Sequence, residues 1–258
     1  MKVVRRLEDV LGLRAFAFGL PMLFGFQLAV AQTTGQLTAN KADEINPSVW
    51  VQKADEIRNP SSSFEMVVKV IDAESAESVL QVFLKGQDKT LIVTKEPLRD
   101  KGRNMLMIDR DFQAYVPNLK RSLRLSLSQK LSGQVANGDI SRTRWFGDYD
   151  VKLESKTAKE HQLFLKGKKD NLTYASLRLW LEVGTNRPLR AEYLGLDGKT
   201  ILKRAFFEEY RMLEGAMRPT SLRIEDINNK TSFVKIQSIK SQPLEDSFFT
   251  VRNMEMVR

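Results

Sequence analysis

The chain has 258 residues, of which 42% are hydrophobic, and it carries a formal net charge of +9 with no cysteine. It is long enough to bury a sizeable core, but no disulfide can stabilise it in an oxidising compartment. Lys and Arg are interleaved with Asp and Glu, which indicates a solvated surface with some attraction to an anionic membrane face. This charge pattern, together with the export predicted below, argues against nucleic acid as a partner.

The first residues have the pattern of a secretory signal. Basic residues between Lys2 and Arg14 precede a short apolar core, Ala15–Leu28, and Ala29-Val30-Ala31 is a small-x-small cleavage site. The core is shorter than the roughly 20 apolar residues of a membrane span. We expect a signal peptide over residues 1–31, cleavage after Ala31, export to the periplasm and a flexible segment over residues 32–45. An uncleaved membrane anchor is the alternative.

A short amphipathic helix is predicted next. Asn46 is a good N-cap residue and Pro47 suits the first helical position. Trp50 and Ala54 recur at helical spacing, and Pro60 requires the helix to end at Arg58-Asn59.

From Phe64 onward the apolar residues follow a period of two, which is typical of strands with one buried face. Asp197-Gly198 predicts a tight hairpin between two such segments. We count about ten or eleven strands with hairpin connections, which favours one β-sandwich or barrel over residues 46–258. Lys89–Val93 and Met105–Ile108 have apolar residues at consecutive positions, so their second face needs a cover such as a helix or a lipid.

The segment from Met105 to Val151 begins as two strands and continues as a long amphipathic excursion. Two short helices are predicted in it, one capped by Ser126 or Ser128 and one capped by Asp139. Loops of this length in a compact domain are often lids or binding loops. The alternative is an ordinary crossover that plugs one end of a barrel. The apolar residues of this excursion are Leu131, Val135, Ile140, Trp145 and Phe146.

This excursion carries a recognisable pattern: an aspartate-led strand, a Tyr-x-Pro turn, basic residues and a glycine-rich segment. The residues concerned are Asp109, Tyr115, Pro117, Arg121, Arg124, Ser128, Gly133 and Gly138-Asp139. The pattern resembles the LolA-like outer-membrane lipoprotein-sorting family, in the broad sense and not its founder lipoprotein chaperone. The resemblance extends over Pro47 to Arg258.

The resemblance implies a mainly β fold, an incomplete antiparallel β-barrel of about eleven strands, with short helices forming a lid over a hydrophobic cavity. Family members lock the lid with an arginine at the end of an early strand. Lys85-Gly86 stands where an Arg-Pro pair is expected, so the locking arginine is absent.

Strand alternation and the resemblance together suggest which residues form the site. The expected cavity and lid residues are Met66, Val68, Leu91, Val93, Met105, Met107, Leu131, Trp145 and Phe146. A basic rim is expected from Arg121, Arg124 and Lys130, which would contact lipid phosphates or an acidic docking partner. A solvated basic surface is the alternative for these three residues.

The predicted function is that of a periplasmic carrier, which binds a lipid or an acylated lipoprotein in the cavity and passes it between envelope components. The alternative is a non-carrying accessory or sensor domain that docks on an inner-membrane exporter or a regulatory membrane protein. The expected partners are acyl chains, such an exporter and, transiently, a membrane surface. No enzymatic activity, metal or cofactor is predicted, because His161 is the only histidine and no nucleophile or phosphate motif is present.

Overall fold

The structure is a computed structural model that describes residues 46–257 except residues 142 and 171. The predicted signal peptide over residues 1–31 and the flexible segment over residues 32–45 lie outside the described residues. Within the described part, no helix is both long enough and apolar enough to cross a bilayer.

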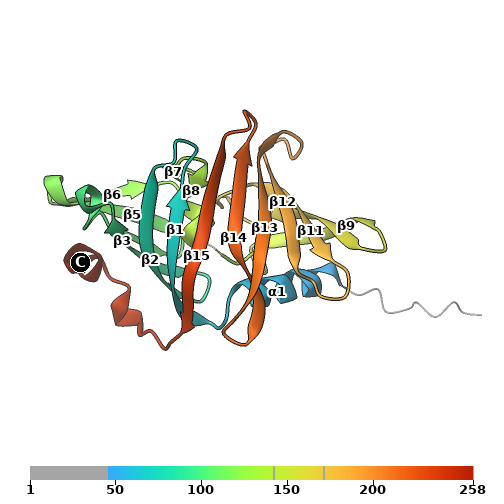
Figure 1. Cartoon of the computed structure of the whole chain (residues 1–258), viewed down its shortest axis with the longest axis horizontal. Coiled ribbons are helices and arrows are strands. Elements are labelled where there is room, and N and C mark those ends of the chain that lie inside the picture. Colours follow the sequence, from blue (N-terminus) through green and yellow to red (C-terminus); the bar gives the residue numbers. More distant parts are fainter. Residues whose placement is uncertain (1–45, 142, 171, 258) are drawn as a thin grey trace, which may run out of the picture. The chain divides into compact units, whose positions relative to one another are not determined.

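One large antiparallel sheet of thirteen strands dominates the described residues (Figure 1). Across the sheet the strand order is β6-β5-β4-β3-β2-β1-β15-β14-β13-β12-β11-β10-β9. The strands are β1 Ser63–Ile71, β2 Glu77–Lys85, β3 Lys89–Glu96, β4 Met105–Ile108, β5 Asp111–Val116, β6 Arg121–Leu125, β9 Tyr149–Lys156, β10 Glu160–Gly167, β11 Ser176–Glu182, β12 Pro188–Leu194, β13 Ile201–Leu213, β14 Ala216–Asp226 and β15 Thr231–Ser241.

The sheet does not close, because β6 and β9 are its two edges and do not pair with each other. All neighbours in the sheet are also neighbours in the chain, except that β1 pairs with β15. The predicted fold class, an incomplete antiparallel barrel, is therefore confirmed, with more strands than the expected eleven. The edge strand β6, RSLRL, shows why strand counting falls short: its exposed arginines hide the alternation that marks a buried strand.

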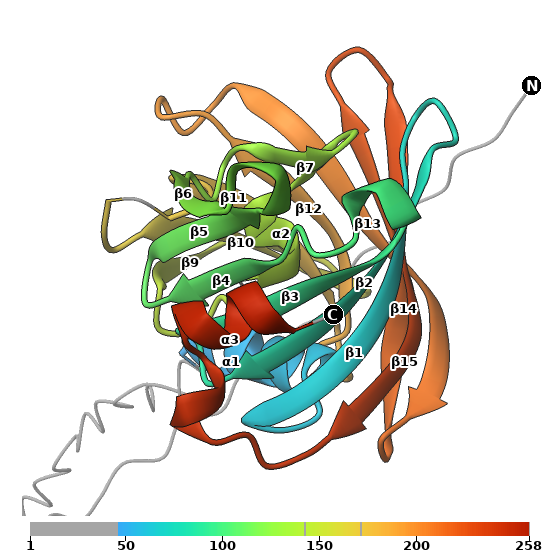
Figure 2. The ribbon, with the colours of Figure 1, turned by 90° about the vertical axis from the view of Figure 1, so that its left-hand side faces the viewer.

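The alternating residues of the central strands point into one main hydrophobic core. In β1 the buried positions are Phe64, Met66, Val68 and Val70, each separated by a less buried residue. The sheet curls around this core (Figure 2). The inner face of the curled sheet is thus apolar along its length, as the period of two predicts.

Helix α1 (Pro47–Arg58) begins and ends where the sequence predicts. The Asn46 side chain accepts a hydrogen bond from the Ser48 backbone N–H at 3.0 Å. Asn59, in extended conformation, ends the helix before Pro60. The helix packs on β9 and β14, and the Trp50 ring lies 4.0 Å from the ring of His161 on β10. This packing brings the C-terminal end of α1 to the main core, where its polar residues become important below.

A second, smaller core lies on the other face of β3 and β4. Leu91, Val93 and Leu106 pack there against Phe249 and Met254 of the C-terminal segment. This segment contains helix α3 (Val251–Met256), which lies over β3 and β4 (Figure 2). The second apolar face predicted for β3 and β4 is therefore covered by a helix. The described residues also form three short 3-10 helices: Leu98–Asp100, Pro117–Leu119 and Asp246–Phe248.

Candidate ligand-binding cavity

Residues 126–148 connect the two edges of the open sheet. They follow β6 and precede β9, and they contain a two-stranded hairpin, β7 (Lys130–Ser132) with β8 (Val135–Ala136), and the short helix α2 (Asn137–Ser141). We call residues 126–148 the cover segment. It is the part of the chain in which the sequence predicts a lid.

The first predicted helix of the cover segment, capped by Ser126 or Ser128, is wrong. Residues after Leu125 form a turn and then the β7–β8 hairpin, in which Gly133 has a φ of +52°. A Cβ on Gly133 would lie 2.4 Å from Ser232 Oγ and 2.6 Å from Asp72 Cβ. Gly133 is thus needed for a close approach to the main sheet and a left-handed turn, not as the end of a helix.

The second predicted helix is present as α2, but it is shorter than expected. It ends at Ser141, so Trp145 and Phe146 lie beyond it. Asp139 lies in its first turn instead of at the N-cap, and its Oδ2 accepts a hydrogen bond from the Ala136 backbone N–H at 2.7 Å.

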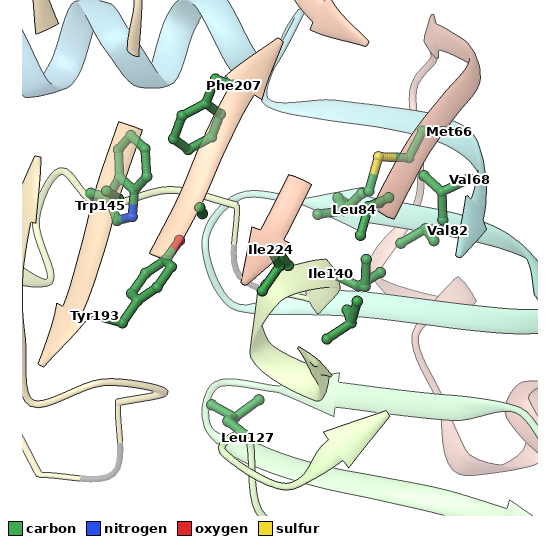
Figure 3. Close-up of a cluster of buried hydrophobic side chains, with 14 of the residues drawn as sticks. Met66, Val68, Val82, Leu84, Leu127, Ile140, Trp145, Tyr193, Phe207 and Ile224 are labelled. Atoms are coloured by element: carbon green, nitrogen blue, oxygen red, sulfur yellow. The ribbon is translucent and has the colours of Figure 1, made fainter. Parts of the chain in front are cut away.

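Ile140 of α2 inserts its side chain into the main core. Figure 3 shows it beside Val82 and Leu84 of β2, and it is only 2% exposed. An apolar cavity of about 60 Å³ remains between this side chain and the sheet, lined among others by Met66, Val68 and Ile140. Pockets for small-molecule ligands have roughly 300–1,000 Å³. The cover segment therefore leaves a cavity smaller than such a pocket beneath it.

A buried ion pair fastens α2 to the sheet. Asp139 Oδ2 accepts a hydrogen bond from Lys203 Nζ of β13, and only 2% and 9% of the two side chains are exposed. The other carboxylate oxygen of Asp139 accepts the Tyr174 hydroxyl at 2.8 Å, and Lys203 Nζ also donates to the Gln134 carbonyl at 3.2 Å. Removing one partner of such a buried pair leaves the other charge buried without compensation.

The C-terminal end of α1 holds the residues that follow α2. Asp55 Oδ2 accepts hydrogen bonds from the backbone N–H groups of Trp145 and Phe146, both at 2.7 Å. Asn59 adds a further contact, because its Oδ1 accepts the Thr143 hydroxyl at 2.6 Å. Burial raises the pKa of Asp55 to about 6, against the lowering effect of Arg58 and of the two N–H groups. Asp55 is thus a buried carboxyl whose pKa lies closer to neutral pH than that of an ordinary aspartate.

Arg58 lies in the same cluster, at the wall of the cavity. Its guanidinium carbon is 4.0 Å from the centroid of the Trp145 ring and 5.3 Å from that of Phe207. Its Nη1 is 3.9 Å from Asp55 Oδ1, which is too long for a hydrogen bond. Burial lowers the pKa of Arg58, while Asp55 acts in the opposite direction. The contact with Trp145 links this cationic side chain to the cover segment.

Comparison with known proteins identifies the family. A family model described only as that of an uncharacterized protein matches residues 86–256. A solved LolA superfamily protein from Nitrosomonas europaea is 33% identical, aligns with 81% of this chain and 99% of its own, and superposes with a TM-score of 0.73. The chain belongs to the LolA superfamily. The resemblance of the excursion to this family is thereby confirmed.

Two more distant structures share the LolA-superfamily fold. One is a domain from Vibrio parahaemolyticus described as outer membrane lipoprotein-sorting, at 19% identity, with 80% of this chain and 97% of that chain covered and a TM-score of 0.66. The other is a DUF1329 family protein from Desulfovibrio piger, at 19% identity, with the same coverage and a TM-score of 0.68. No curated protein matches the sequence.

The structure does not place the predicted cavity and lid residues in a single environment. Met66 and Val68 line the cavity, whereas Met105, Met107 and Trp145 are buried elsewhere in the same main core. Leu131 is half-buried against that core, and Phe146 is 37% exposed.

Leu91 and Val93 lie on the opposite face of the sheet, under the C-terminal segment, so their placement in the cavity is wrong. Ile92, between them, faces the main core, and the Thr90 hydroxyl donates to the Ser141 carbonyl at 2.8 Å. Both faces of β3 are buried, and a run of consecutive buried residues does not reveal which face points to which core.

The predicted basic-rim residues are exposed, but none of them lines the cavity. Arg121 and Arg124 lie on the edge strand β6, and Lys130 lies on β7. Arg124 Nε pairs with Asp111 Oδ1 at 2.7 Å. Lys85, where the resemblance leads us to expect a locking arginine, pairs with Asp246 of the C-terminal segment at 2.8 Å. Hydrogen bonds to the cover segment come instead from α1, β3, β13 and β15.

Sequence reasoning missed Asp55, Arg58 and Lys203. A signal was available for Lys203, because it occupies the same phase of β13 as the buried residues Ala205 and Phe207. A lysine in the buried phase of a strand needs a partner of opposite charge. The sequence singles out Asp139 as a helix cap and as part of the family pattern, but not as the partner of a buried lysine, so the pair was not foreseen.

The buried pair should behave as one unit. We expect Lys203→Met to lower the free energy of unfolding by about 3–5 kcal/mol, because Asp139 is left buried without its cation. The double variant Asp139→Asn/Lys203→Met should lose less than the sum of the two single variants, as measured by urea unfolding. Lys235→Met is the control, since Lys235 pairs with Glu209 at the surface and should cost under about 1 kcal/mol. Strictly additive losses at Asp139 and Lys203 would contradict the ion pair.

The raised pKa of Asp55 predicts a pH-dependent stability. Between its ordinary pKa of 3.8 and about 6, the folded protein binds a proton that the unfolded chain has released. The stability from this group is therefore present at low pH and lost as the pH rises through 6. Wild type should lose stability relative to Asp55→Asn as the pH rises from about 4 to about 7, measured by urea unfolding of both proteins. Parallel curves over that range would show that the pKa of Asp55 is not raised in the folded protein.

Proposed function

We propose that this LolA-superfamily chain is a periplasmic carrier that binds a lipid or the acyl chains of a lipoprotein under its cover segment and passes them between envelope components. The main support for this proposal is the position of the Ile140 side chain. A short helix, tied to the walls by polar contacts, places an apolar side chain into an apolar cavity of an unclosed sheet. An acyl chain that replaces it gains about 0.8 kcal/mol per buried methylene.

The Vibrio relative, described as a lipoprotein-sorting domain, supports an envelope location and this class of cargo for the present chain as well. The Nitrosomonas protein, which has higher sequence identity, supports membership of the same superfamily. Release of the cargo would follow from return of Ile140 to the core, or from tighter binding by an acceptor protein.

The non-carrying alternative, an accessory or sensor domain that docks on a membrane protein, is favoured by one observation. The cavity of about 60 Å³ is already too small for an acyl chain, as expected for a domain whose core is permanently filled. The two functions therefore differ in whether the cover segment can be displaced by an apolar ligand.

Two alanine substitutions test whether an apolar ligand can displace the cover segment. Ile140→Ala should destabilise the chain by about 2–4 kcal/mol and enlarge the cavity, and it should bind a neutral apolar dye, N-phenylnaphthylamine, more tightly than wild type. Val93→Ala also truncates a fully buried side chain, but it lies under the C-terminal segment. It should lose stability without gaining dye affinity, as measured by fluorescence titration. An equal gain for both variants, or no binding by wild type and Ile140→Ala, would contradict carriage.

A further inference from the structure

The wall of the cavity contains an unusual combination of groups. Among the described residues that line it, the charged side chains are Arg58 and Asp139, and most of the others are apolar. Asp139 is fully engaged by Lys203, Tyr174 and the Ala136 backbone N–H. Arg58 is therefore the charged group of the cavity wall with hydrogen-bonding capacity to spare.

Two polar atoms of this wall are buried without a hydrogen-bond partner among the described residues: Nη1 of Arg58 and Oγ of Ser221 on β14. The nearest anion to Arg58 is Asp55, but the Nη1–Oδ1 distance of 3.9 Å exceeds a hydrogen bond. The other oxygen of Asp55 is held by the backbone of Trp145 and Phe146. Asp55 Oδ1 is itself buried without a hydrogen-bond partner among the described residues. Arg58 Nη1 thus has a nearby countercharge but no acceptor within hydrogen-bond distance.

The unpartnered Nη1 of Arg58 and the unpartnered hydroxyl of Ser221 lie in one largely apolar wall. Both are hydrogen-bond donors, and together they suit an anion. Arginine binds carboxylate and phosphate oxygens with short, charge-assisted hydrogen bonds. Leaving such groups unpaired in a low-dielectric site is costly, and a ligand that satisfies them recovers that cost. The acyl chains of a lipoprotein, joined through esters and an amide, offer acceptors but no charge.

We propose that Arg58 and Ser221 bind the acidic head of a single-chain amphiphile, a fatty acid or a monoalkyl phosphate, whose chain occupies the cavity in place of Ile140. This inference rests on the proposed carrier function and narrows its cargo to acidic lipids. The stacking of Arg58 on Trp145 gives the bound head group a direct connection to the cover segment.

The test compares ligands that share one chain and differ in the head group. Dodecanoate, dodecyl phosphate and dodecanol are titrated into the full mature protein against bound N-phenylnaphthylamine. Wild type should bind at least one of the two acids roughly 10- to 100-fold more tightly than the alcohol, the gain expected for a charge-assisted hydrogen bond. Which acid binds more tightly identifies the head group as carboxylate or phosphate.

Arg58→Gln should remove this preference while dodecanol still binds. Arg211→Gln is the matched control, because the Arg211 side chain is 69% exposed on β13, and it should keep the wild-type preference. Since loss of a buried arginine can also unfold the chain, Ser221→Ala provides a milder variant, expected to weaken both acids several-fold and to leave the alcohol unchanged.

The outcomes separate the two proposals. Equal affinity of wild type for the acids and the alcohol would overturn the acidic-head inference and leave the carrier function standing. The same holds if the preference survives in both Arg58→Gln and Ser221→Ala. Failure of wild type to bind any of the three ligands would overturn the carrier function, and the inference with it.

Discussion

When the two edge strands of a curled antiparallel sheet do not pair, strand pairing alone leaves part of its apolar inner face open to water. In this chain the edges are β6 and β9, and the cover segment, residues 126–148, is the connection between them. The hairpin, α2 and Ile140 follow from this one constraint, because apolar side chains must be removed from water to stabilise the fold. A fully paired barrel would need no such segment.

The cover segment is held by buried polar contacts as well as by apolar packing. Apolar side chains alone would cover the core at lower cost than a buried ion pair, which often contributes little net stability. Here the Asp139–Lys203 pair and the Asp55 contacts fix where α2 lies, while Ile140 and Trp145 supply the apolar contact. Polar contacts that water can replace when the segment moves suit a cover that opens. The Arg58 guanidinium, which lies over the Trp145 ring, joins the proposed site for an acidic head to this same cover.

Much of the fold was predictable from local patterns. The period of two located the central strands, and Asn46, Pro47 and Pro60 located helix α1, because these signals depend only on neighbouring residues. The family resemblance identified the superfamily. The face of Leu91 and Val93 was not predictable, since β3 is buried on both sides and its outer cover, α3, lies far away in the sequence. The β7–β8 hairpin was missed for a similar reason: Gly133 is required by contacts with Asp72 and Ser232, which are distant in the chain. The polar anchors also join residues far apart, as Asp55 does with Trp145.

We propose that the cover segment yields its place in the core to an apolar ligand. The decisive measurement is native mass spectrometry of the protein purified from the periplasm, followed by extraction and identification of bound lipid. We expect a stoichiometric lipid that copurifies with the wild-type chain. A chain that is repeatedly isolated empty, and remains empty after incubation with periplasmic lipid extract, would contradict it and favour a non-carrying accessory or sensor domain.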